Sequence, residues 1–346
     1  MSTPKVTKSW TVEGTGSLDC LKFDEKRALP ELSDNEVLVK FHAASLNFRD
    51  IMIAMGTYPF GVAPGIIPGS DGAGEVVAVG SKVTRFETGS KVVTLFMQTH
   101  YGGPLTPQVL GSGVGGSIDG TLRQYGIFNE NGLVHMPKNL SYLEAGTLSC
   151  SALTAWNALY GLKAVSLSDW VLVQGSGGVS ISGLQFAKAA GARVIATTSS
   201  AAKAKILKDL GADHVINYKE NANWGDEAKK LTGGVGVDHV LEVGGATTVT
   251  ESLKAVAIGG LVTIVGWIGG EGETGPSFPQ ILSSMAVIRG IVVGSREQFE
   301  AMIRVIEASN IKPVLDQRVF KLEDLKEAYK YMADQKHFGK VAISIE

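Results

Sequence analysis

A run of glycines separates an apolar segment from a helical pattern in "VLVQGSGGVS", residues 171–180. Glycines at a turn from strand into helix let the backbone approach a pyrophosphate lying against the N-terminus of the helix. With a strand before it and a helix after it, the pattern G-x-G-x-x-S predicts dinucleotide binding, although Ser180 stands where glycine or alanine is usual. A tight turn without a ligand is the alternative interpretation. The predicted contacts are Gly175, Ser176, Gly177, Gly178 and Val179.

The next strand ends without the acid that NAD sites normally use. In such sites an Asp or Glu about 20 residues beyond the glycines accepts hydrogen bonds from the adenosine ribose. No acidic residue occurs between Asp169 and Asp209, and "ARVIATTSS" is followed by lysines. Hydroxyl and ammonium groups suit a 2′-phosphate, which a carboxylate would repel. We therefore expect NADP(H), bound by Thr198, Ser199, Ser200 and Lys203. The alternative is that Ser199 only caps a helix whose lysines face solvent, and such a cap is compatible with phosphate binding.

Two kinds of pattern must position these residues. Up to about residue 130, short β-rich runs such as "NEVLVKFHAAS" alternate with glycine and proline turns and predict an all-β region. From about residue 141, apolar runs alternate with helical stretches, which predicts a parallel sheet covered by helices on both faces. Ser141 and Glu144 have the spacing of a capping box at the start of that region. Residues 102–120 are rich in glycine and predict an exposed loop.

Composition excludes several classes of function. The 346 residues are long enough for two domains, and 44% of them are hydrophobic. A net charge of −2 gives no indication of nucleic acid or an anionic membrane as a partner. Two cysteines cannot build a disulfide framework or a four-thiolate zinc site. Because the first residues contain no apolar leader and no run of about 18 apolar residues occurs anywhere in the sequence, we expect a cytoplasmic protein.

The chain resembles the medium-chain dehydrogenase/reductase superfamily over essentially its whole length. The resemblance rests on "SLNFRD", "PGSDGAGEVVAVGSKVTRF", "VLVQGSGGVS", "LGADHVINY", "GVGVDHVLEVGG" and "HFGKVAI", and it is nearest to zinc-free quinone oxidoreductases and zinc-type alcohol dehydrogenase-like proteins. It implies an α/β protein in which a GroES-like β-rich catalytic domain is joined to a Rossmann domain with a doubly wound parallel sheet, with a cleft between them and a homodimer. The implied limits are 1–132 with 299–346 for the catalytic domain and 133–298 for the Rossmann domain.

The positions that hold zinc in related alcohol dehydrogenases carry other residues here. The first ligand position falls on Asn47, and the Gly-His-Glu motif reads Gly69, Ser70, Asp71. One carboxylate without its Cys and His is poor zinc ligation, so no metal is expected. We interpret Asp71 as an anchor of its own glycine-rich turn.

Without a metal, another group must meet the charge that develops when hydride adds to an electrophilic carbon. The resemblance points to Asn47, which matches an asparagine near the nicotinamide in zinc-free relatives and is expected to serve both catalysis and cofactor binding. It also points to Tyr58 in "GTYP", which matches a tyrosine proton donor of related enoyl reductases. A turn amide and an aromatic wall are the alternative roles of these two residues. Asp50 is expected to be a structural partner in the same loop.

Further cofactor contacts follow from the resemblance alone: Thr154, Tyr218, Gly244, Gly266, Phe338 and Lys340. The implied function is an NADPH-dependent, zinc-independent reductase of an activated carbonyl compound, either a conjugated enone or enal or a quinone. One alternative is a zinc-free alcohol dehydrogenase or carbonyl reductase that acts directly on C=O. An alternative of another class is a cofactor-binding protein with little turnover.

Overall fold

The computed structural model describes residues 4–270 and 275–346, which fall into two compact units. The first unit comprises Met1–Leu153 with Gly294–Glu346, and the second comprises Thr154–Val293. The limits of the catalytic and Rossmann domains that the resemblance implies stay a prediction. By packing alone, residues 133–153 belong to the first unit, since the strand β7 (Leu133–His135) pairs with β5 (Lys91–Thr94).

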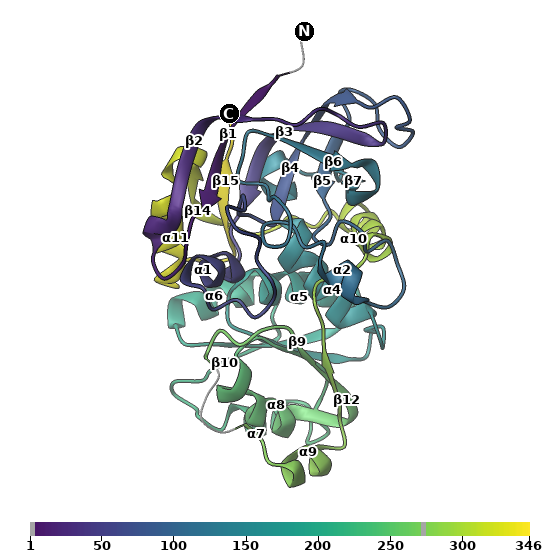
Figure 1. Cartoon of the computed structure of the whole chain (residues 1–346). Coiled ribbons are helices and arrows are strands. Elements are labelled where there is room, and N and C mark those ends of the chain that lie inside the picture. The colour runs from purple at the N-terminus through teal and green to yellow at the C-terminus, as the bar shows by residue number, and fades with distance from the viewer. Residues whose placement is uncertain (1–3, 271–274) are drawn as a thin grey trace. The chain divides into compact units, whose positions relative to one another are not determined.

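The first unit is built on a sheet whose strands come from both ends of the chain (Figure 1). Its order is β14-β15-β3-β4-β5-β7, with β6 also paired to β3. β14 and β15 are parallel, and the remaining pairs are antiparallel. The other strands of this sheet are β3 (Glu36–Ser45), β4 (Asp71–Val79), β6 (Tyr125–Asn129), β14 (Leu315–Lys321) and β15 (Lys340–Ser344). β1 (Val6–Val12) and β2 (Leu21–Ala28) pair with each other in a separate antiparallel sheet. The pairing of Ala342 with Ser45 sets the last strand beside the third and so positions the candidate site.

Helices close the edges and ends of this unit. The α-helices are α1 (Phe48–Met55), α2 (Pro107–Leu110), α3 (Tyr142–Ala145), α10 (Arg296–Ala308) and α11 (Leu325–Ala333). Shorter turns are η1 (Leu18–Cys20), η2 (Glu130–Gly132), η5 (Leu322–Asp324) and the π-helical turn η3 (Leu148–Ala152). The Ser141–Glu144 capping box predicted from the sequence is confirmed. The π-helical turn η3 lies between α3 and α4 (Leu153–Tyr160).

The second unit is a parallel sheet of order β10-β9-β8-β11-β12-β13. The order runs one way from β8 and then reverses to β11. The parallel pairing confirms the prediction from the apolar runs, and the reversal is the doubly wound arrangement that the family resemblance implied. Every residue of β8 is buried, as a strand covered on both faces requires. The strands are β8 (Trp170–Gln174), β9 (Arg193–Thr198), β10 (His214–Asn217), β11 (Val237–Glu242), β12 (Val256–Ile264) and β13 (Val287–Gly290).

One helix precedes the first of these strands in the chain, and the others connect the strands. They are α4 (Leu153–Tyr160), α5 (Gly178–Ala189), α6 (Ala201–Asp209), α7 (Trp224–Leu231), α8 (Val249–Ala255) and α9 (Phe278–Ser284), with the short turn η4 (Gly245–Thr247). In parallel sheets of this kind, ligands bind outside the carboxyl ends of the strands where the order reverses. Here those ends belong to β8 and β11. Across residues 4–270 and 275–346, no helix combines the length and apolar character needed to cross a bilayer.

Candidate active site

The buried ammonium group of Lys340 is the centre of a polar cluster in the first unit. Its Nζ donates to the Leu46 carbonyl at 2.7 Å, to Asn47 Oδ1 at 2.6 Å and to Asp71 Oδ2 at 2.9 Å. The Lys340 residue is only 6% exposed, and Asp71 is fully buried. A buried ion pair is stable only when hydrogen bonds satisfy its remaining donors and acceptors, and three acceptors do so for this ammonium.

Asp71 accepts hydrogen bonds from four donors on separate elements. Its Oδ2 receives Ser45 Oγ at 2.6 Å and Asn47 Nδ2 at 2.9 Å in addition to Lys340. Its Oδ1 receives the backbone N–H of Cys150 at 2.7 Å, from the π-helical turn η3. The sequence pattern predicts that this carboxylate holds its own glycine-rich turn. Instead it joins β3, β15 and η3, which are remote in sequence.

The orientation of the Asn47 amide follows from this cluster. Because Oδ1 accepts from Lys340, Nδ2 must face Asp71 Oδ2 and Ser70 Oγ, the latter at 3.2 Å. Two acceptors therefore engage the amide nitrogen inside the protein. Asn47 also caps α1, where its backbone N–H donates to Asp50 Oδ2 at 2.8 Å. This geometry favours a positioning role for Asn47 over donation to a substrate.

These side chains do not fit a zinc ion. Zinc needs thiolate, imidazole or carboxylate ligands and one open position. Asn47 and Ser70 offer no such group, and both oxygens of Asp71 accept hydrogen bonds. Burial, reinforced by the charge of Asp71, raises the pKa of the Cys150 thiol to about 12, so the thiol keeps its proton. Within the described ranges, no group of three or more His, Cys, Asp or Glu residues is arranged to hold a metal.

Tyr58 lies beyond the C-terminus of α1 and contacts a largely buried arginine. Arg49 Nε donates to the Tyr58 hydroxyl oxygen at 3.2 Å, and the guanidinium carbon lies 4.8 Å from the centre of the tyrosine ring. The Arg49 side chain is 10% exposed and also stacks on Phe96 at 4.9 Å. Neither Arg49 nor Phe96 was singled out from the sequence, although Arg49 belongs to the "SLNFRD" motif.

The glycine-rich segment supports this arginine. The Val114 carbonyl accepts from Arg49 Nη1 at 3.0 Å, and a Cβ added at Gly116 would lie 2.6 Å from Nη2. Residues 112–116 are buried, so the prediction of an exposed loop over 102–120 was wrong for this part. Glycine-rich composition predicts solvent-facing turns, whereas here the missing side chain of Gly116 leaves room for a guanidinium group.

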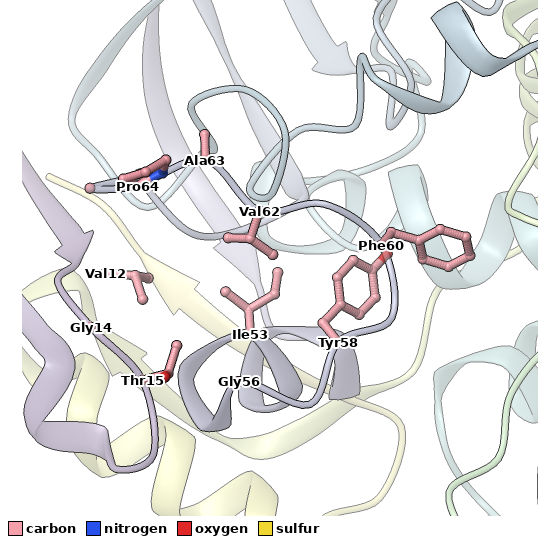
Figure 2. A pocket seen from close by; sticks show the side chains of 11 residues that line it. Val12, Gly14, Thr15, Ile53, Gly56, Tyr58, Phe60, Val62, Ala63 and Pro64 are labelled. Carbon is pink, nitrogen blue, oxygen red and sulfur yellow. The ribbon is translucent and has the colours of Figure 1, made fainter.

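A cavity of about 390 Å³ lies against Tyr58 (Figure 2). Figure 2 shows the side chains of Val12, Ile53 and Val62 directed toward a common space, with the Tyr58 ring on one side. The lining residues are Val12, Gly14, Thr15, Ile53, Gly56, Tyr58, Phe60, Val62, Ala63, Pro64 and Gly65, none of which is charged. The cavity therefore suits an uncharged, largely apolar group and has a phenol at its wall.

The glycine loop of the second unit joins β8 to α5, as the sequence predicted. Gly175 has φ +77°, a conformation that favours glycine, and Gly177 is the N-cap of α5. A Cβ added at Gly177 would meet no protein atom within 4 Å, so protein packing gives no reason for a glycine there. At Gly183 an added Cβ would lie 2.5 Å from Leu241 Cδ2, which explains the close approach of α5 to β11. The loop thus fits a dinucleotide pyrophosphate.

The turn after β9 places hydroxyl groups at a second helix N-terminus. Ser200 is the N-cap of α6, and its Oγ accepts from the backbone N–H of Lys203 at 3.4 Å. The alternative interpretation had given the cap to Ser199. Thr198 is buried at the strand end, and its Oγ1 accepts from the Ser200 N–H at 3.3 Å. A helix N-terminus with a lysine in its first turn is a favourable position for a phosphate.

Sequence reasoning missed a buried carboxylate at the point where the sheet order reverses. Glu242 ends β11, is fully buried, and accepts from Gln174 Nε2 at 2.7 Å and from Ser252 Oγ at 2.5 Å. It also accepts from Thr248 Oγ1 and from the N–H groups of Gly244 and Gly245. Gln174 immediately precedes the glycine loop, so this network ties the loop to β11. An acid inside an apolar run was the available signal.

The remaining predicted contacts are scattered over both units. Thr154 is buried at the start of the second unit, Tyr218 is 41% exposed after β10, and Gly266 is half-buried after β12. Phe338 is half-buried in the first unit, where its N–H donates to Asp316 Oδ2 at 2.9 Å. The structure brings only Lys340 and Asn47 of the predicted residues into direct contact in the polar cluster. The cofactor roles of the others stay predictions.

Comparison with known proteins places both regions in one family. Residues 33–138 match the alcohol dehydrogenase GroES-like domain, and residues 178–308 match the zinc-binding dehydrogenase family. A zinc-type alcohol dehydrogenase-like protein of Schizosaccharomyces pombe is 46% identical over 334 residues, covering 95% of this chain and 96% of the relative. The 2-methylene-furan-3-one reductase of Solanum lycopersicum is 30% identical over 350 residues, covering 99% of this chain and 80% of the relative.

The fold also resembles that of solved structures of alcohol dehydrogenases. A crystal structure of an NAD-dependent alcohol dehydrogenase superposes with a TM-score of 0.87 at 31% identity, covering 98% of this chain and all of that one. The family match, the β-rich unit and the parallel sheet agree with one another. The chain is an oxidoreductase-type protein of the medium-chain dehydrogenase/reductase superfamily.

Proposed function

We propose that this protein is an NADPH-dependent, zinc-independent reductase of activated carbonyl compounds, with conjugated enones, enals or quinones as substrates. The observation that carries the proposal is the ammonium of Lys340, which makes hydrogen bonds to Asn47 and Asp71 where related enzymes bind a metal. A second cation would be repelled from this position. Electrophilic assistance must then come from a hydrogen-bond donor.

Tyr58 is the residue that we assign to this role. Its hydroxyl oxygen accepts from Arg49, so its own proton is directed elsewhere and is available to an oxygen or carbon of the substrate. A conjugated carbonyl compound that receives hydride becomes an enolate, which requires a proton. Asn47 has its amide nitrogen engaged within the protein and acts by holding the cluster in place.

The second unit would hold the cofactor, which supplies the hydride when bound. The N-terminus of α5, with Gly177 as its N-cap, is suited to the pyrophosphate. Ser200 and Lys203 at the start of α6 are suited to the 2′-phosphate, and the stretch lacks a carboxylate that would repel it. One structural relative is described as NAD-dependent, so the family alone does not decide between the two cofactors. The proposed preference for NADPH therefore rests on these residues.

The cavity beside Tyr58 supports a substrate that is apolar and uncharged near its reactive end. Ligand sites of this kind are largely apolar with a few placed polar groups. The name of the tomato relative, a 2-methylene-furan-3-one reductase, describes a compound with a double bond conjugated to a carbonyl. That resemblance favours reduction of the conjugated C=C bond.

The test is a screen of NADPH and NADH oxidation with quinones, enones, enals and simple ketones, followed by identification of the product. We expect saturation of the C=C bond of enones or formation of hydroquinones, faster with NADPH than with NADH. An alcohol formed from a simple ketone as the best substrate would favour the second candidate, direct reduction of C=O, which the alcohol dehydrogenase relative supports. Tight NADPH binding with no turnover would favour a cofactor-binding protein instead.

A further inference from the structure

A largely buried arginine contacts the proposed proton donor through both the hydroxyl and the ring. Arg49 Nε donates to the Tyr58 hydroxyl oxygen at 3.2 Å, and its guanidinium lies 4.8 Å from the ring centre. A donor that already occupies one lone pair of the oxygen limits where the phenolic hydrogen can point. A fixed positive charge also stabilises the negative charge left on the oxygen when that hydrogen is given up.

The position of Arg49 is fixed from several sides. Nη1 donates to the Val114 carbonyl at 3.0 Å and lies 3.8 Å from Asp50 Oδ1, while the plane stacks on Phe96. Gly116 leaves room for Nη2, since a Cβ there would lie 2.6 Å from it. A side chain so constrained loses little entropy when the reaction occurs, and preorganised donors of this kind contribute most to catalysis.

We propose that Arg49 is the positioning residue of the reaction, directing the Tyr58 proton toward the substrate and stabilising the phenolate that remains. This inference rests on the proposed function, because it requires Tyr58 to be the proton donor. It goes beyond that function by assigning a role to the arginine and to the glycine-rich segment that holds it.

The test is a double-mutant cycle on the best enone, with Tyr58→Phe, Arg49→Met and the two changes combined. General acid catalysis typically contributes about 10²–10⁴-fold, so kcat of Tyr58→Phe should fall within that range. A charge-assisted hydrogen bond is commonly associated with an effect of about 10- to 100-fold, so Arg49→Met should lower kcat by that factor with little change in the KM for NADPH. In the Tyr58→Phe background, Arg49→Met should cause almost no further loss.

Two further variants keep the test decisive if Arg49→Met does not fold. Arg49→Lys keeps the charge but not the planar fork, so it should retain part of kcat. Gly116→Ala should displace the guanidinium and give a similar partial loss. Arg123→Met is the matched control, because Arg123 is also buried and lies 5.2 Å from the Phe128 ring without contacting Tyr58. Any loss that it causes should be the same with Tyr58 and with Phe at position 58.

A second readout does not depend on turnover. In protein carrying isotope-labelled tyrosine, the Tyr58 ring resonance can be assigned by its absence from Tyr58→Phe. It should shift in Arg49→Lys and stay unchanged in Arg123→Met. Losses that multiply in the double variant, or a Tyr58 resonance indifferent to Arg49, would overturn the positioning role alone. A wild-type protein without reductase activity, or Tyr58→Phe with full kcat on an enone, would overturn the proposed function as well.

Discussion

Lys340 places an ammonium group among side chains that a metal ion would otherwise share. Its three acceptors come from the end of β3, the start of α1 and the start of β4, so the cation also fastens these elements together. Removing one partner of a buried ion pair typically costs about 3–5 kcal/mol, because the other charge is left buried and unpaired. Lys340 thus contributes to the local stability and, by its positive charge, disfavours a metal ion at the same site.

Zinc should therefore be present at well below one ion per chain in the purified protein, and chelators should leave its turnover intact. Changing Asn47→Cys together with Ser70→His supplies ligands but leaves the repelling ammonium, so zinc should bind weakly. Adding Lys340→Met should tighten zinc binding, because the positive charge is gone. Competition with a chromogenic chelator measures the zinc affinity of the wild type, the double variant and the triple variant. Stoichiometric zinc in the wild-type protein, lost together with activity, would contradict the proposal.

Asp50 carries a second charge whose cost depends on pH. Burial, with Asp71 contributing, raises the pKa of the Asp50 carboxyl from its ordinary value near 3.8 to about 6, against the lowering effect of Arg49. As the pH rises, the unfolded chain releases this proton at a lower pH than the folded protein does. The protonated carboxyl of Asp50 therefore favours the folded state at low pH, and this contribution to stability is lost as the pH rises from about 4 to 6.

Asp50→Asn should remove this dependence while keeping an acceptor for the Asn47 N–H. Between pH 4 and pH 7, the free energy of unfolding of the variant should gain on that of the wild type by about 3 kcal/mol or less, since one pKa unit corresponds to about 1.4 kcal/mol. Urea unfolding of both proteins at several pH values gives the comparison. A constant difference across this range would show that Asp50 is charged at no cost in the folded protein.

At the scale of elements, the N-terminus of α6 is where the two cofactors should be distinguished. Lys203 lies in its first turn, and Ser200 caps it. Lys203→Ala should weaken NADPH binding by about 10- to 100-fold, because a charge-assisted hydrogen bond to phosphate is lost. NADH affinity should hardly change. Lys208→Ala, in the last turn of the same helix, is the matched control. Fluorescence titration measures the affinity of each variant for both cofactors. Equal losses of affinity for NADPH and NADH would exclude phosphate recognition by Lys203.

The segment after α1 should determine which enone substituents the enzyme accepts. Val62→Trp would fill the cavity beside Tyr58. Each buried CH₂ contributes about 0.8 kcal/mol, so losing contact with two carbons should lower kcat/KM about 10-fold for long-chain enones. Methyl vinyl ketone, which has no alkyl chain to place against Val62, should lose much less activity. Val79→Trp is a suitable control, because Val62 and Val79 are both 39% exposed and only the former lines the cavity.

The elements themselves could be predicted because periodicity, glycine turns and caps are local. The strands from β8 to β13 and the Ser141–Glu144 box followed from such patterns. The contacts of Lys340 could not be predicted in the same way, since Asp71 lies 269 positions away and meets it only through the pairing of β15 with β3. Likewise, glycine composition indicates a turn but does not show that the turn encloses the side chain of Arg49.

At the scale of the whole molecule, the outer edge of the sheet in the second unit is a place where another chain could pair. Among the residues that the structure describes, β13 pairs with β12 alone, so its other side presents backbone N–H and C=O groups. Large apolar side chains are exposed around it: Ile258 (71%), Phe278 (88%), Leu282 (78%) and Met285 (57%). A free strand edge beside apolar surface is a liability unless another chain covers it.

A second copy of this chain is the partner that we propose for this edge, giving a homodimer. Stable interfaces bury about 1,600 Å² in total, so the exposed apolar side chains around β13 would have to contribute contacts beyond the strand pair itself. Val287 lies on β13 and is 46% exposed, and Val287→Lys would place like charges opposite each other across a twofold axis. Val319→Lys changes a valine of similar exposure, 43%, on β14 at the edge of the other sheet. Light scattering after size-exclusion chromatography should show a dimer for the wild type and Val319→Lys, and a monomer for Val287→Lys. A monomeric wild type, or a dimer that only Val319→Lys disrupts, would contradict an interface at β13.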